Sequence, residues 1–159
     1  MTDYTIEAED MQLDGYSAQS NSADASGGGY IQTWGDGVAT STFEGEAGTY
    51  HVDLTMFDEN DGASTVELVV NGEVVSVVIL DQDEGGNYIN DTLTKFSLTE
   101  IELQPGDTIE IRGTSASPEA ARIDKIDLTA VVDAEPTDPS LIGDNVVILN
   151  ETFDDSPLA

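Results

Sequence analysis

The chain has 159 residues, enough for one domain with its own hydrophobic core and a short additional segment. Its 33 acidic and 4 basic residues leave a formal net charge of −29, so we expect no binding to nucleic acid or to anionic membranes. It contains no cysteine, which excludes disulfides, thiol catalysis and zinc sites built on cysteine.

Runs rich in Thr, Val, Ile and Tyr recur along the chain, separated by Gly, Asn and Asp at intervals of roughly 8–12 residues, which predicts an all-β antiparallel sandwich. The predicted strands are residues 4–9, 30–34, 38–43, 49–57, 64–70, 73–80, 96–103, 108–112 and 121–131. The segments 11–26, 58–62, 81–91 and 114–120 are predicted loops. Asn71 and Gly72 stand between two alternating apolar runs and favour a type I′ hairpin turn.

The composition changes after Val132. Residues 133–144 form an acidic, proline-containing linker behind the predicted sandwich at 1–132. Residues 145–159 are interpreted as the start of a following domain or as a tail that packs on the sandwich. No signal peptide is visible, because Met1 leads directly into the first strand, and no stretch has transmembrane length.

Four pieces of the sequence, in order, resemble carbohydrate-binding modules of families 6 and 35. They are IEAED at 6–10, SGGGYI at 26–31, EAGTY at 46–50 followed by VNGE at 70–73, and LQPGDTI at 103–109 closed by RIDKI at 122–126. The resemblance spans about residues 4–131. It implies a jelly-roll-like β-sandwich with a structural calcium ion and a sugar site formed by loops at one end.

A calcium site is predicted at the start of the chain. Alternate residues of a strand share a face, so the carboxylates of Glu7 and Glu9 would repel each other there unless a cation lay between them. The glycines after Ser26 let the backbone curl and offer carbonyl oxygens, and Asp124 matches the C-terminal ligand of the family. The predicted ligands are the side chains of Glu7, Glu9 and Asp124 and the carbonyls of Ser26 and Gly29. The alternative is that both glutamates simply face solvent.

Aromatic side chains are the predicted sugar platforms. Stacking on an aromatic ring is worth about 1–3 kcal/mol in the comparable case of nucleic-acid bases. Trp34, the single tryptophan, stands at a strand end and is predicted to be either a platform or a core residue. Tyr88 lies in a Gly- and Asn-rich loop, where the family usually has a second aromatic residue, and could instead be an ordinary exposed tyrosine.

Arg122 stands where the family often has an asparagine, two residues before Asp124. Its five donors could bind a sugar hydroxyl, a uronate or a sulfate, or an acidic residue of the 58–62 loop could lock it structurally. The residues predicted to line a polar pocket around it are Asp58, Glu59, Asn60, Asp61, Glu119 and Arg122.

The favoured function is that of a non-catalytic, monomeric polysaccharide-binding module of a larger secreted protein. The acidity suits a marine source and a neutral or weakly charged algal glucan or galactan. One alternative is a glycosidase that uses two carboxylates. The resemblance argues against it, and among 33 acidic residues some pair will always have a suitable separation, so such a pair is no specific signal. Another is a calcium-dependent adhesion or surface-layer domain that binds a protein. His51, the only histidine, lies in an alternating strand and is predicted to face solvent.

Overall fold

The computed structural model describes residues 2–20, 22, 25–58, 62–81, 93–116 and 120–131. Within them the chain forms strands and two 3₁₀ turns: β1 (Tyr4–Glu7), η1 (Ala8–Asp10), β2 (Gln12–Asp14), β3 (Ser17–Gln19), η2 (Ser26–Gly28), β4 (Tyr30–Thr33), β5 (Asp36–Thr42), β6 (Gly48–Phe57), β7 (Thr65–Val70), β8 (Glu73–Ile79), β9 (Leu93–Leu103), β10 (Thr108–Thr114) and β11 (Ala121–Ala130). The predicted site residues outside the described ranges are Glu59, Asn60, Asp61, Tyr88 and Glu119, as are the linker at 133–144 and the segment at 145–159.

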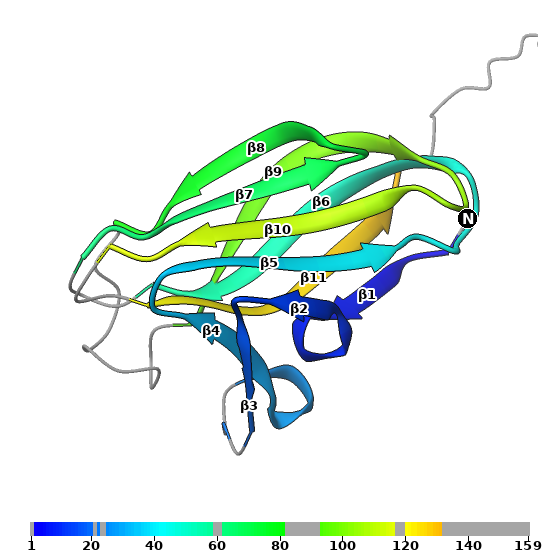
Figure 1. Ribbon diagram of the computed structural model, residues 1–159. Helices are drawn as coiled ribbons and strands as arrows, with labels where there is room; N and C mark the ends of the chain where they lie inside the picture. Colours follow the sequence, from blue (N-terminus) through cyan, green and yellow to red (C-terminus); the bar gives the residue numbers. More distant parts are fainter. Residues whose placement is uncertain are drawn as a thin grey trace, which may run out of the picture.

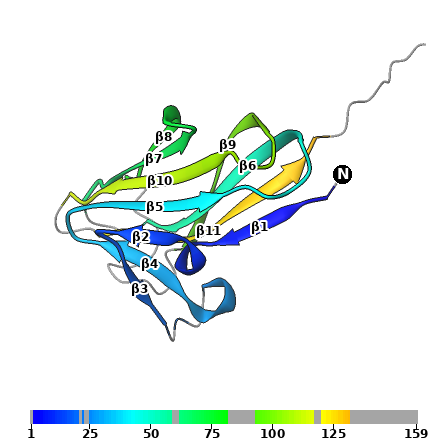
Figure 2. The ribbon, with the colours of Figure 1, turned by 45° about the vertical axis from the view of Figure 1, so that its right-hand side comes forward.

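Two antiparallel sheets face each other, as predicted (Figures 1 and 2). One has the order β3-β4-β11-β6-β9, with β1 also paired to β11, and the other has the order β2-β5-β10-β7-β8. Alternating apolar residues from both sheets meet in one core, and the largest fully buried side chains include Tyr50, Leu54, Met56, Ile109, Ile111, Ile123, Ile126 and Leu128. The described residues contain no helix with the length and hydrophobicity needed to cross a membrane.

The two ends of the sandwich differ. Cross-strand pairing places Arg122 opposite Phe57 at the end where Trp34 joins β4 to β5, which we call the Trp34 end. The β7–β8 turn and the β9–β10 turn lie at the opposite end, which we call the hairpin end. Asn71 and Gly72 take positive φ values of 51° and 83° in the β7–β8 turn, which confirms the predicted hairpin.

The sequence prediction was wrong in three places. The predicted loop at 11–26 contains β2 and β3, which pair with β5 and β4. Both strands have only three residues and lie at sheet edges, so they carry little hydrophobic alternation. The first strand ends at Glu7 rather than Glu9, because the chain turns into η1 at Ala8. The strand predicted to start at Phe96 begins at Leu93.

Candidate functional site

Three carboxylates from distant parts of the sequence gather beside the first and last strands. Antiparallel pairing of β1 with β11, with Glu7 opposite Lys125, brings the start of the chain next to its last strand. Glu9 lies in η1, so the two glutamates do not share a strand face as predicted. They converge all the same: a Cβ atom on Gly27 would lie 3.9 Å from Glu7 Oε1 and 3.8 Å from Glu9 Oε2.

Asp124 reaches this place through a β-bulge. The pairing of β11 with β6 shifts between Ile123, which faces Met56, and Lys125, which faces Thr55, and leaves Asp124 as the extra residue. A bulge re-aims a side chain that regular alternation would point elsewhere. Asp124 is 1% exposed, and its two carboxylate oxygens accept hydrogen bonds from the Ser26 N–H at 3.0 and 3.1 Å.

The segment after Ser26 holds these carboxylates together. The Ser26 hydroxyl donates a hydrogen bond to Glu7 Oε2 at 2.7 Å, so Ser26 bridges Glu7 and Asp124. Gly27 and Gly28 have φ values of 64° and 81°, which favour glycine. A Cβ atom on Gly29 would lie only 2.9 Å from Glu9 Oε2, so the absence of a side chain lets this carboxylate approach the backbone. We call Glu7, Glu9, Asp124, Ser26 and the three glycines the carboxylate cluster.

The cluster is electrostatically incomplete. Glu7 Oε1 and Glu9 Oε1 are buried and accept no hydrogen bond from any described residue. Burial raises the pKa of Asp124 to about 6, and the negative charges of Glu7 and Glu9 add to this, against the Ser26 N–H and Lys125. Burial is also the largest cause that raises the pKa of Glu9, to which the charge of Glu7 contributes. A cation placed here would offset these repulsions.

The donors suit a hard cation such as Ca²⁺, which takes carboxylate, hydroxyl and carbonyl oxygens together. In the part of the chain that the structure describes, no three His, Cys, Asp or Glu side chains close around one point at metal-binding distance. A cation at the carboxylate cluster would therefore need backbone or hydroxyl oxygens as well. Ser26 offers both kinds, and its carbonyl accepts only a long 3.4 Å hydrogen bond from the Gly29 N–H.

Trp34 is exposed at the other predicted site. Its side chain follows β4 and is 59% exposed, so the alternative of a core tryptophan is wrong. The Arg122 guanidinium carbon lies 5.4 Å from the centre of the Trp34 ring, a cation–π distance. Arg122 Nε donates a hydrogen bond to Gln32 Oε1 at 3.0 Å, and burial lowers the pKa of Arg122. Gln32 is the cross-strand partner of Arg122, a role that the sequence interpretation missed.

Asp58 lies at the same end. It is fully buried directly after Phe57, the residue opposite Arg122 on β6. The end of β6 and the start of β11 therefore lie side by side, whereas residues 59–61 and 117–119 lie outside the described residues. Of the residues predicted to line a polar pocket, the structure describes Asp58 and Arg122, and Arg122 contacts Trp34 and Gln32.

His51 does not form a catalytic triad, although a serine and an aspartate lie beside it. Its Nε2 atom is 2.7 Å from Ser97 Oγ and 3.2 Å from Asp53 Oδ1. A Ser-His-Asp relay needs the acid on one ring nitrogen and the serine on the other. Here both groups share Nε2. The histidine side chain is 35% exposed, so it is partly open to solvent, as predicted.

No family model matches the chain. An α-glucuronidase of Hypocrea jecorina is 27% identical over 133 residues, which are 79% of this chain and 16% of that protein. Among solved structures, the GH26-CBM35 β-(1,4)-mannanase of Podospora anserina is similar over 84% of this chain and 29% of its own, with 24% identity and a TM-score of 0.66. The chain therefore spans less than a third of these enzymes.

Two isolated modules match over almost their whole length. A family 35 carbohydrate-binding module of Clostridium thermocellum has a TM-score of 0.64 at 15% identity, over 82% of this chain and 100% of its own. The C-terminal CBM6 of LamC, a marine laminarinase from Zobellia galactanivorans, has a TM-score of 0.59 at 14% identity, over 80% and 99%. The resemblance found in the sequence is thus confirmed: this chain has the β-sandwich fold of carbohydrate-binding modules.

Proposed function

We propose that the chain is a non-catalytic polysaccharide-binding module of a larger secreted carbohydrate-active protein. The observation that carries the proposal is the exposed Trp34 ring at the loop end of a carbohydrate-binding-module fold, next to the guanidinium of Arg122. An exposed ring offers an apolar face to a pyranose, and the adjacent polar groups can bind its hydroxyls. The similarity to short parts of long enzymes supports a modular parent.

The carboxylate cluster is the proposed place of a structural calcium ion. Glu7, Glu9 and Asp124 would hold it with Ser26 and Gly29, the predicted ligands. The ion would neutralise the converging carboxylates and join β1, the segment at 26–29 and β11, which Ser26 already links through its hydrogen bonds to Glu7 and Asp124. Nothing in this role requires the ion to touch the sugar.

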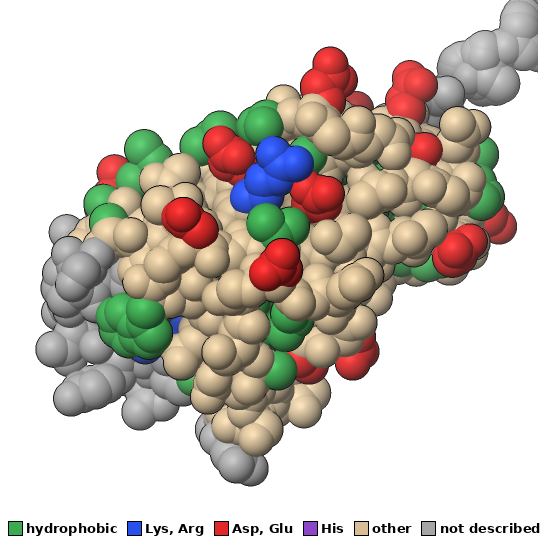
Figure 3. All heavy atoms as spheres, viewed as in Figure 1, with side chains coloured by type: hydrophobic (Ala, Val, Ile, Leu, Met, Phe, Trp, Pro, Cys, Tyr) green, Lys and Arg blue, Asp and Glu red, His purple; other side chains and the backbone are tan. Residues whose placement is uncertain are grey.

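The proposed ligand is a neutral or weakly charged polysaccharide, with algal glucans and galactans favoured. The net charge of −29 opposes chains rich in sulfate or uronate. On the face of the β2-β5-β10-β7-β8 sheet, acidic side chains are scattered and no broad basic patch is visible among the described residues (Figure 3). The cation on this sheet, Arg112, is already paired with Glu110 at 2.7 Å.

The test is a binding screen of the purified chain against marine and plant polysaccharides, such as laminarin, agar and mannan, with and without calcium. We expect retention on at least one neutral polymer and its loss in Trp34→Ala. Val77→Ala is the matched control, because Val77 is also exposed but lies on β8, an edge strand of the sheet that does not contain β4 and β11. Failure of every polysaccharide to bind would contradict the proposal.

A second candidate function is adhesion to a protein. It is favoured by β8, an edge strand on which Val74, Val77 and Ile79 are 46–54% exposed. An apolar edge strand can pair with a strand of another protein. A glycan array separates the two candidates, because an adhesion domain would retain no polysaccharide while its β8 edge captured a protein strand.

A further inference from the structure

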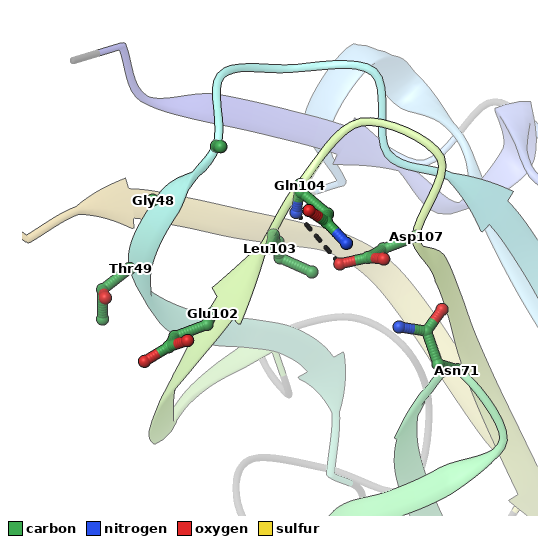
Figure 4. A pocket seen from close by; sticks show the side chains of 8 residues that line it. Gly48, Thr49, Asn71, Glu102, Leu103, Gln104 and Asp107 are labelled. Atoms are coloured by element: carbon green, nitrogen blue, oxygen red, sulfur yellow. Dashed lines mark hydrogen bonds between the residues drawn. The ribbon is translucent and has the colours of Figure 1, made fainter.

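A polar hollow lies at the hairpin end, away from Trp34. It has a volume of about 480 Å³ and is lined by Ala47, Gly48, Thr49, Asn71, Glu102, Leu103, Gln104 and Asp107. Figure 4 shows the side chains of Gln104, Asp107 and Asn71 on one side of it and those of Thr49 and Glu102 on the other. This volume lies within the roughly 300–1,000 Å³ that small-molecule sites occupy.

Hydrogen bonds to the backbone fix two of these side chains. Asn71 Oδ1 accepts a hydrogen bond from the Thr108 N–H at 2.9 Å, and Asp107 Oδ2 accepts one from the Gln104 N–H at 2.9 Å. The acceptor of the Asn71 amide is therefore used within the protein, and its NH₂ group remains for a ligand. Asp107 keeps its second oxygen. A site with side chains already held in place loses less entropy when it binds.

The remaining polar groups are open to a ligand. Neither the Glu102 carboxylate nor the Gln104 side-chain amide hydrogen-bonds to any residue that the structure describes. The hollow thus offers amide donors beside carboxylate acceptors, and its negative charge opposes an anion. A sugar hydroxyl both donates and accepts, and its bond to a carboxylate is charge-assisted. Two adjacent hydroxyls of a sugar ring can therefore bind an amide donor and a carboxylate acceptor that lie side by side.

We propose that the hollow at the hairpin end is a second sugar-binding site, which takes a single unit of a neutral sugar through adjacent ring hydroxyls. The described lining contains no aromatic ring, so the site works by hydrogen bonds alone and is weaker than a stacking platform. It is a separate site from that of Trp34, and neither needs the other.

The test is a titration of the ¹⁵N-labelled chain with glucose and with galactose, followed by the amide NMR signals of Asn71, Gln104 and Thr108. We expect saturable shifts with millimolar affinity for at least one sugar, and we expect them to persist in Trp34→Ala. Asn71→Asp keeps the acceptor for the Thr108 N–H and removes the NH₂ group, so it should weaken binding at least fivefold. Gln12→Glu, which adds the same charge on β2, should change it less than twofold.

Asn71 lies in the β7–β8 turn, so Asn71→Asp could weaken binding by disturbing the turn, and a second pair of variants is used that does not alter it. Glu102→Gln should weaken binding at least threefold, whereas Glu44→Gln, an exposed position outside the lining, should not. The proposal is overturned if neither sugar gives saturable shifts or if both lining variants bind as the wild type does. It is also overturned if the shifts vanish in Trp34→Ala. Ethylammonium serves as a small organic cation, and shifts caused by it but not by the sugars would show that the carboxylates of the hollow bind cations instead.

Discussion

The carboxylate cluster and the Trp34 end differ in what they bury and what they expose. In the cluster, like charges are buried together and joined by Ser26, and two carboxylate oxygens accept no hydrogen bond from the residues that the structure describes. At the Trp34 end, an apolar ring is exposed and a cation lies over its face. In the first arrangement the negative charges outweigh the nearby cation Lys125, and in the second an exposed ring offers contact surface. Under the proposed function, the first region would stabilise the fold and the second would bind the ligand.

Removal of calcium should have the largest effect, and it should affect stability alone. An ion held at a thousandfold excess over its dissociation constant stabilises the folded state by about 4 kcal/mol. For a domain of this size that corresponds to a fall on the order of 10 °C in Tm when a chelator is added. Differential scanning calorimetry measures the change, and re-added calcium should reverse it. An unchanged Tm would contradict the proposal that the cluster binds calcium.

Without calcium, Asp124 should make the protein less stable as the pH rises. Its folded pKa of about 6 exceeds the usual 3.8, so between these values the folded state binds more protons than the unfolded state. The free energy of unfolding is therefore highest at low pH and falls by about 3 kcal/mol in total as the pH rises from about 4 through about 6. Urea unfolding from pH 4 to 7 in a chelator measures it, with Asp124→Asn as the variant that should lack this component.

Trp34→Ala tests the other side of the comparison. Loss of a stacking ring worth about 1–3 kcal/mol should weaken polysaccharide binding roughly 5- to 150-fold. Because the ring is 59% exposed, Tm should change by no more than about 2 °C. Calorimetric titration and a melting curve on the same sample separate the two effects. A large fall in Tm would make Trp34 a structural residue.

Two glycine substitutions contrast the regions directly. Gly29→Ala would place a Cβ atom 2.9 Å from Glu9 Oε2 and should destabilise the domain by about 1–2 kcal/mol, with weaker calcium binding. Gly35→Ala, beside Trp34, would meet no atom within 4 Å and should leave stability unchanged within about 0.5 kcal/mol. Chemical denaturation compares the pair. Equal effects would show that the cluster is no more tightly packed than the exposed end.

Local sequence patterns predicted the longer strands and the hairpin, because alternation and the Asn71-Gly72 pair act over a few residues, but they missed the short edge strands β2 and β3. The spacing of Glu7 and Glu9 and the glycines after Ser26 pointed to a metal site, and the family resemblance added Asp124; the structure brings these residues together. The bulge that turns Asp124 inward was not predictable, because it depends on the register between β11 and β6. Gln32 was missed for the same reason, since only the pairing of β4 with β11 brings it to Arg122.

The smallest expected effect concerns Gln32 as a positioning residue. Its side-chain oxygen holds Arg122 Nε at 3.0 Å, while the guanidinium lies over the Trp34 ring. Gln32→Ala should weaken sugar binding about 3- to 10-fold, as expected for one hydrogen bond, and Gln32→Glu should restore it because the acceptor returns. The single tryptophan supplies an independent readout, since its fluorescence should change in Gln32→Ala before any sugar is added. Weaker binding with unchanged fluorescence would mean that Gln32 contacts the sugar itself rather than orienting Arg122.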